Sequence, residues 1–198
     1  MGYEYAWDVK YQYMVGHGNK LSPYLGFPWL NVTSALFQNL AALENASAHG
    51  NIPSSSSSSD ESEGQRFFLS FTHREVPPFL ATALGLFDSA ADTPEVLHPS
   101  HINFGRAWKM VELIPFLGHI GIEKMHCSAA SGAKPGKHDF VRVIANSAPR
   151  PIPACQNGPG ATCEFGEFRR FVREGMERYG DFHSVCGEHE LNEKDVDE

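Results

Sequence analysis

The stretch RFFLSFTHREVPPFLATALGLF, residues 66–87, organises this chain. Residues 67–72 form an apolar and β-branched run, which predicts one buried strand. Two prolines at 77 and 78 then open the apolar segment FLATALGLF, which predicts a helix ending near Gly85. Proline is accepted in a first helical turn because its missing N–H is not needed there. The stretch is therefore predicted to be a strand followed closely by a helix.

Between the predicted strand and helix lie His73, Arg74 and Glu75. In open α/β sheets, ligands gather at the carboxyl ends of strands, where helix N-termini offer free N–H groups to anions. An imidazole, a guanidinium and a carboxylic acid at this position favour an anionic substrate and a proton transfer. The alternative is that a His close to a Glu is ordinary surface decoration, and the strand–helix context argues against it.

The segment SFTHREVPPFLATALGLF resembles the second signature of the histidine acid phosphatases, the family of fungal acid phosphatases and phytases. Most members carry His-Asp there, and others carry His-Ala-Glu with the Glu as proton donor. The His-Arg-Glu of this chain matches the second spacing. The resemblance implies that His73 contacts the transferring phosphoryl group and that Glu75 protonates the leaving alcohol. It places Arg74, in the variable middle position, at the substrate-binding rim or in solvent.

Other segments resemble the same family in the same order, namely residues 25–40, 106–127 and 140–172. The implied fold is α/β, a phosphoglycerate-mutase-like sandwich with a mixed central sheet. We expect residues 1–198 to form a single, partial domain of that fold, its C-terminal portion. The implied activity is hydrolysis of phosphate monoesters through a phosphohistidine, without a metal or other cofactor. Phytate and simple monoesters remain open as substrates.

The nucleophilic motif of the family, Arg-His-Gly-x-Arg-x-Pro, has no counterpart, since Arg-His-Gly occurs nowhere in the sequence. The nearest match is Gly16-His17-Gly18, which is interpreted as a loop after a helix. Whether the chain is itself an active phosphatase therefore stays open. The alternatives are a non-catalytic phosphate-binding or interaction remnant, and a chain that docks with a missing N-terminal half as partner.

The formal net charge of −8 argues against a nucleic-acid partner. No apolar run approaches the roughly 20 residues of a membrane span, so no membrane partner is expected. The family implies a secreted protein. However, the chain starts without a basic and apolar signal peptide, which would leave it in the cytoplasm if made as printed.

The resemblance implies a disulfide between Cys155 and Cys163. A metal site at these two cysteines is the weaker interpretation. Cys127 and Cys186 match family cysteines whose partners lie in the missing half. They could also pair with each other or stay reduced. Asn31 and Asn45 begin glycosylation triplets, which matter only in a secreted protein.

The remaining elements are predicted from periodicity. Helices are expected at residues 3–15, 29–45 and 164–179, and a hairpin from a strand at 108–127, interrupted near Pro115, and its partner at 140–146. The aromatic stripe of the first helix is interpreted as packing, and the arginines of the last as a solvated face. His98 and His101 lie in a loop without a third metal ligand. Residues 49–65 are predicted to be a disordered Ser-rich insertion, and residues 187–198 a flexible acidic tail.

The expected chemistry depends on the protonation state of Glu75, which must carry a proton to act as an acid. Charged His73 and Arg74 would oppose that protonation, while burial would favour it. The sequence leaves this balance open. If the sheet lacks a partner half, its apolar surface should be exposed, so we expect marginal stability or aggregation of the chain alone.

Overall fold

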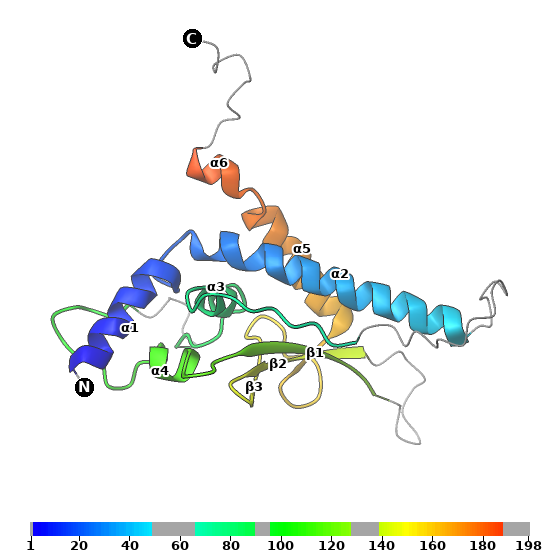
Figure 1. The fold of residues 1–198 in the computed structure, drawn as a ribbon, viewed down its shortest axis with the longest axis horizontal. Helices are drawn as coiled ribbons and strands as arrows, with labels where there is room; N and C mark the ends of the chain where they lie inside the picture. The colour runs from blue at the N-terminus through cyan, green and yellow to red at the C-terminus, as the bar shows by residue number, and fades with distance from the viewer. Residues whose placement is uncertain (1, 49–65, 90–95, 128–138, 188–198) are drawn as a thin grey trace, which may run out of the picture.

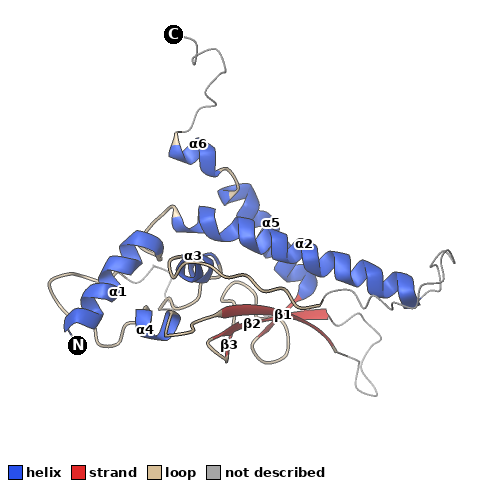
Figure 2. Ribbon diagram, in the orientation of Figure 1, coloured by secondary structure: helices blue, strands red, loops and turns tan. Residues whose placement is uncertain are grey.

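The computed structural model describes residues 2–48, 66–89, 96–127 and 139–187 (Figure 1). Figure 2 shows the strands gathered on one side of the helices α2 and α3, with α1 and α4 together at one end of the molecule. The elements are α1 (Gly2–Val15), α2 (Ser22–Ala48), α3 (Val76–Ala83), α4 (Met110–Leu113), β1 (Ile120–His126), β2 (Asp139–Ala145), β3 (Ala148–Arg150), β4 (Thr162–Glu164), α5 (Phe165–Tyr179) and α6 (Phe182–Cys186).

The sheet is built around β2, which pairs antiparallel with β1, β3 and β4. Val141 and Val143 are fully buried on one face of β2, as the alternating pattern predicts. Asn146 and Ser147 both have positive φ angles, 51° and 67°, which produce the tight turn between β2 and β3. The predicted strand at 140–146 and its antiparallel partner are confirmed.

The helices α3 and α5 pack closely against α2. A side chain at Gly26 would lie 2.5 Å from the carbonyl oxygen of Phe79 in α3, and a side chain at Gly175 of α5 would overlap the Phe27 ring. Phe27 also stacks on Tyr179 with ring centroids 5.4 Å apart. Glycine at these two contacts thus lets α3 and α5 approach α2 closely.

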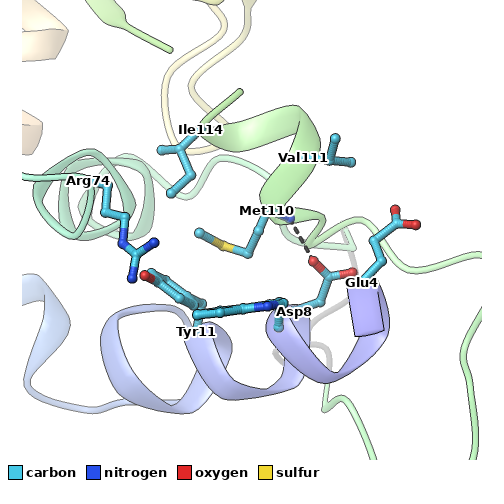
Figure 3. A pocket seen from close by; sticks show the side chains of 8 residues that line it. Glu4, Asp8, Tyr11, Arg74, Met110, Val111 and Ile114 are labelled. Carbon is cyan, nitrogen blue, oxygen red and sulfur yellow. Dashed lines mark hydrogen bonds between the residues drawn. The ribbon is translucent and has the colours of Figure 1, made fainter. Parts of the chain in front are cut away.

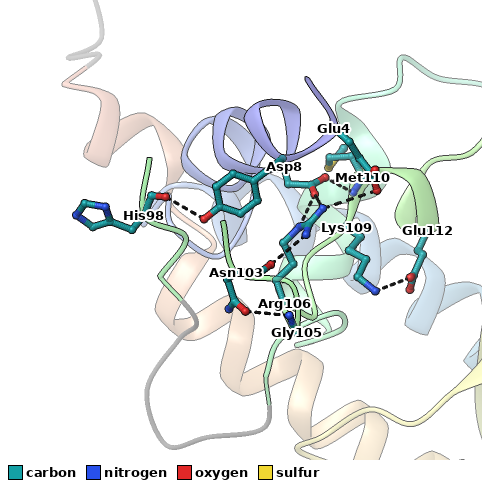
Figure 4. Close-up of polar contacts among 10 residues, drawn as sticks. Glu4, Asp8, His98, Asn103, Gly105, Arg106, Lys109, Met110 and Glu112 are labelled. Atoms are coloured by element: carbon teal, nitrogen blue, oxygen red, sulfur yellow. Dashed lines mark hydrogen bonds and ion pairs between the residues drawn. The ribbon is translucent and has the colours of Figure 1, made fainter. Parts of the chain in front are cut away.

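The N-terminal helix α1 buries Tyr5, Tyr11 and Val15 in the core and also makes polar contacts with residues 97–110 (Figure 4). The Asp8 carboxylate accepts from Arg106 Nε at 2.6 Å and from Met110 N at 2.8 Å. Gln12 Oε1 accepts from Leu97 N at 2.9 Å, and Tyr5 Oη donates to the His98 carbonyl at the same distance. These contacts fix α1 beside α4 and confirm the helix predicted at 3–15.

The strand predicted at residues 67–72 is wrong as a paired strand. Residues 66–72 are exposed and lie outside the sheet that the described residues form. The side chain of Phe71 is 92% exposed. β-propensity describes a side chain that fits a half-buried sheet, and pairing needs a neighbouring strand. Among the described residues, no strand lies beside residues 67–72 to pair with them.

Two boundaries differ from the predictions. The helix predicted at 29–45 begins already at Ser22, so Pro28 lies inside α2 rather than at its start. An interior proline removes a backbone hydrogen bond, and packing of Phe27 and the fully buried Leu30 compensates for it. The first part of the strand predicted at 108–127 is the short helix α4, whose last carbonyls accept from Asn146 Nδ2 at 2.6 and 3.0 Å.

The helices predicted after Pro77 and at 164–179 are confirmed as α3 and α5. Gly85 has a positive φ of 70°. The Gly85 and Leu86 N–H groups donate back to Thr82 and Ala81, a Schellman ending for α3. No helix of the described residues is both long and apolar enough to cross a bilayer. The predicted insertion at 49–65 and, beyond Gly187, the predicted tail lie outside the described residues.

Candidate active site

The triplet His73-Arg74-Glu75 lies between the extended segment and α3. The Val76 N–H donates to the His73 carbonyl at 3.1 Å, which turns the chain into the helix. Glu75 occupies the N-cap position of α3 with a helical φ of −77° and makes no side-chain cap. Its carboxylate is therefore left to contact other groups.

Figure 3 shows Arg74 directed toward the Tyr11 ring of α1. Arg74 Nε donates to Glu75 Oε1 at 3.0 Å, and Tyr11 Oη donates to the same oxygen at 3.3 Å. The guanidinium carbon of Arg74 lies 5.4 Å from the Trp7 ring centroid and 5.6 Å from that of Tyr11. A carboxylate, a guanidinium and a phenol thus converge at one point.

These contacts give the direction in which the pKa of Glu75 shifts, which the sequence alone left open. The hydrogen bond from Arg74 lowers the pKa of Glu75 below its ordinary value, helped by a backbone hydrogen bond, while partial burial opposes the shift. The same hydrogen bond raises the pKa of Arg74. Burial raises the pKa of Tyr11. The ion pair therefore favours the ionised form of Glu75 and the charged form of Arg74.

The structure brings the side chains of Arg74 and Glu75 into contact, whereas the His73 side chain is exposed to solvent. The main-chain carbonyl of His73 accepts the hydrogen bond from the Val76 N–H. The roles predicted for His73 and Glu75 therefore stay predictions. Arg74, whose side chain is 62% exposed, lines the rim of a pocket with Tyr11.

Sequence reasoning missed Tyr11 and Trp7, because it assigned the aromatic residues of α1 to packing. Tyr11 is 64 residues from Glu75 in the chain, so no local pattern could join them. The high aromatic content of residues 3–15 is the sequence feature that could have indicated a binding surface on this helix. The structure leaves Trp7 42% exposed.

Other predicted sites are placed as follows. The disulfide Cys155–Cys163 is present, and Cys127 and Cys186 are both free and exposed. Asn31 is exposed within α2, but the Thr33 of its triplet is buried and donates to the Trp29 carbonyl. The side chain of Asn45 lies outside the described residues.

Several histidines outside the triplet lie in the described part of the chain. The rings of His98 and His101 stack with centroids 4.9 Å apart. No cluster of three or more His, Cys, Asp or Glu side chains suited to a metal occurs among the described residues. In the Gly16-His17-Gly18 loop, His17 Nε2 donates to the Leu86 carbonyl oxygen, 2.8 Å away, and the His17 ring packs edge-on against Trp108. His17 is therefore a packing residue.

Comparisons with known proteins identify the family of this chain. A family model described as the histidine phosphatase superfamily, branch 2, matches residues 1–146. Phytase PHO112 of Candida albicans is 29% identical over 185 residues, which cover 92% of this chain and 32% of that protein. Acid phosphatase PHO1 of Komagataella pastoris is 26% identical over 183 residues, 92% of this chain and 33% of the relative.

A solved structure gives the same fold. The crystal structure of the phytase from D. castellii superposes with a TM-score of 0.64 at 22% sequence identity, covering 92% of this chain and 32% of that one. The chain thus spans about a third of the length of these relatives. The α/β fold expected from the sequence is confirmed, and the chain belongs to the histidine phosphatase superfamily, branch 2.

Proposed function

We propose that this chain supplies the proton donor and a phosphate contact of a phosphomonoesterase that works through a phosphohistidine. The observation that carries the proposal is the meeting of Arg74, Glu75 and Tyr11 beside an open pocket at the start of α3. The names of the relatives, phytase and acid phosphatase, support the same reaction class.

In the proposed reaction, the nucleophilic histidine comes from outside these 198 residues, because the sequence holds no Arg-His-Gly motif. Its ring nitrogen attacks phosphorus, the ester P–O bond breaks, and Glu75 gives its proton to the leaving oxygen. A water oxygen then attacks phosphorus, the P–N bond to the histidine breaks, and inorganic phosphate and the free histidine result, while the proton of the attacking water returns to Glu75. His73 and Arg74 compensate charge on the phosphoryl oxygens.

The ion pair of Glu75 with Arg74 gives Arg74 a second role in this proposal. Glu75 has to be protonated before it can donate, and the hydrogen bond from Arg74 lowers its pKa and so opposes protonation. A substrate phosphate that draws Arg74 away would remove this opposition, and the pKa of Glu75 would rise. The largely exposed Arg74 side chain has room for that movement.

The second candidate function is a non-catalytic phosphate-binding remnant of the same fold. The observation that favours it is the ion pair itself, because a carboxylate held ionised by an arginine is poorly suited to donate a proton. An exposed arginine next to it would still attract a phosphate.

A chimera separates the two functions. This chain would replace the matching segment of the Candida albicans phytase, and hydrolysis of p-nitrophenyl phosphate would be followed. We expect Glu75→Gln to lower kcat by about 100-fold, the usual contribution of a general acid. Glu112→Gln is the matched control, since this carboxylate only pairs with Lys109 on the surface. Equal rates for Glu75→Gln and the unmodified chimera would favour the remnant. The chain alone is expected to give no turnover.

A further inference from the structure

A cavity of about 260 Å³ opens between α1 and α4, with Arg74 among the residues that line it (Figure 3). Its size suits one aromatic ring with a small substituent, since a cavity of about 150 Å³ already holds benzene. The proposed chemistry uses the Glu75 carboxyl but leaves this cavity without a role.

The walls of the cavity are mostly apolar. Trp7 and Tyr11 form one side, with ring centroids 5.4 Å apart and planes tilted by 44°. Met110 and Val111 of α4, with Ile114 directly after the helix, form the opposite side. Val111 is 57% exposed, so part of this apolar surface faces solvent at the mouth. Aromatic walls of this kind favour a flat ring in an offset or edge-on position.

The charges divide the cavity into two ends. Arg74 lies at one end, over the Trp7 and Tyr11 rings. Glu4 and Asp8 lie at the other (Figure 3), where the single guanidinium of Arg106 pairs with Asp8 and lies 3.7 Å from Glu4. A ligand with one anionic group therefore fits with that group toward Arg74, whereas a second anionic group deeper in the cavity would meet acidic side chains.

Glu75, the proposed proton donor, contacts two of the residues that line the cavity. Its Oε1 accepts from both Tyr11 and Arg74, which line the cavity. A general acid must lie beside the leaving oxygen, so the alcohol attached to that oxygen extends away from phosphorus on the side of the acid. The cavity adjoins Glu75 through these two shared residues, Tyr11 and Arg74.

Resting on the proposed function, we propose that this cavity is the leaving-group subsite for phosphate monoesters of small aromatic alcohols, and that it disfavours substrates with several phosphates. Trp7 and Tyr11 contact the ring of the leaving alcohol, while Arg74 attracts the phosphate. Glu4 and Asp8 outnumber the one guanidinium of Arg106, so the far end keeps a net negative charge that disfavours a polyanionic leaving group.

Binding to the chain itself tests this subsite without turnover. The probes are phenylphosphonate, methylphosphonate and inositol hexakisphosphate, with affinity measured by NMR shifts of the Trp7 indole and the Met110 methyl group. We expect phenylphosphonate to bind about tenfold more tightly than methylphosphonate, because its ring becomes buried. Trp7→Ala should remove this preference, whereas Tyr3→Ala, on the same helix but 90% exposed and outside the cavity, should keep it.

Phenol serves as a probe that needs no phosphate contact. Shifts of the Trp7 and Met110 resonances with phenol as well as phenylphosphonate would support the subsite. Absence of these shifts with both probes, equal binding of phenyl- and methylphosphonate, or a preference that survives Trp7→Ala would overturn it. Tighter binding of inositol hexakisphosphate than phenylphosphonate at these resonances would also overturn it. An inactive chimera would contradict the proposed function alone, because ring binding by the isolated chain is measured separately.

Discussion

Asp8→Ala is expected to loosen α1 from the segment that leads into α4. The Asp8 side chain is fully buried, and the Arg106 side chain is only 7% exposed. Alanine would leave the Arg106 guanidinium without its closest carboxylate and the Met110 N–H without its acceptor. Breaking one partner out of a buried ion pair costs about 3–5 kcal/mol. For a chain of this size that corresponds to a fall in Tm of about 10 °C.

Glu4→Ala is the matched control. Glu4 lies on the same helix and is 3.7 Å from the same guanidinium, but its side chain is 45% exposed. Exposed ion pairs contribute less than about 1 kcal/mol, because water screens them. The measurement is urea unfolding followed by circular dichroism, with thermal unfolding as a second probe.

The double replacement Asp8→Leu with Arg106→Met completes the test. Removing both charges of a buried pair is often close to neutral, because no unpaired charge remains. We therefore expect the double variant to be more stable than Asp8→Ala. If Asp8→Ala cost no more than Glu4→Ala, α1 would not depend on the buried pair, and its position beside α4 would need another explanation.

Three other changes have defined outcomes. Arg74→Gln should raise the pKa of Glu75 toward its ordinary value, as measured by NMR titration. In the unmodified chain the Arg74–Glu75 pair stabilises the folded state above the ordinary pKa of a glutamate. This stabilisation is lost as the pH falls through the lowered pKa of Glu75 in the folded state. Phe71→Lys should reduce self-association in sedimentation without lowering the unfolding midpoint, since this ring is 92% exposed. Replacing Cys155 and Cys163 by serine should lower the free energy of unfolding by about 2.5 kcal/mol in urea titrations, the entropy of closing a short loop.

Local patterns predicted the elements whose stability is local or repetitive. In α5, Phe168 and Val172 recur at helical spacing and are buried, and in β2 the valines alternate into the core. The disulfide between Cys155 and Cys163 came from the family resemblance. For each of these, the residues that decide the outcome lie close together in the chain or match a known family.

The elements that the sequence did not predict depend on distant partners. The buried face of α1 carries Asp8 and Gln12, whose partners Met110 and Leu97 are 102 and 85 residues away. A pattern of apolar residues cannot show that a buried polar side chain will be satisfied. The apolar run at 67–72 has strand composition, yet pairing is non-local. The contact between Tyr11 and Glu75 likewise exists only once α1 lies against α3.

Arg74 couples phosphate binding to the ionisation of Glu75, and this coupling can be measured. In the free chain Arg74 lowers the pKa of Glu75. In the active chimera, a bound phosphate that takes up Arg74 should shift the pKa of Glu75 upward, so that activity persists above the pH at which free Glu75 loses its proton. The measurement compares the alkaline limb of the kcat profile with the NMR titration of Glu75 in the free chain. Arg74→Gln should narrow the gap between the two values, because the free carboxyl no longer has an arginine to lose. A Glu75 pKa that is the same with and without phosphate would show that Arg74 stays on Glu75, and a proton donor would then have to be sought elsewhere.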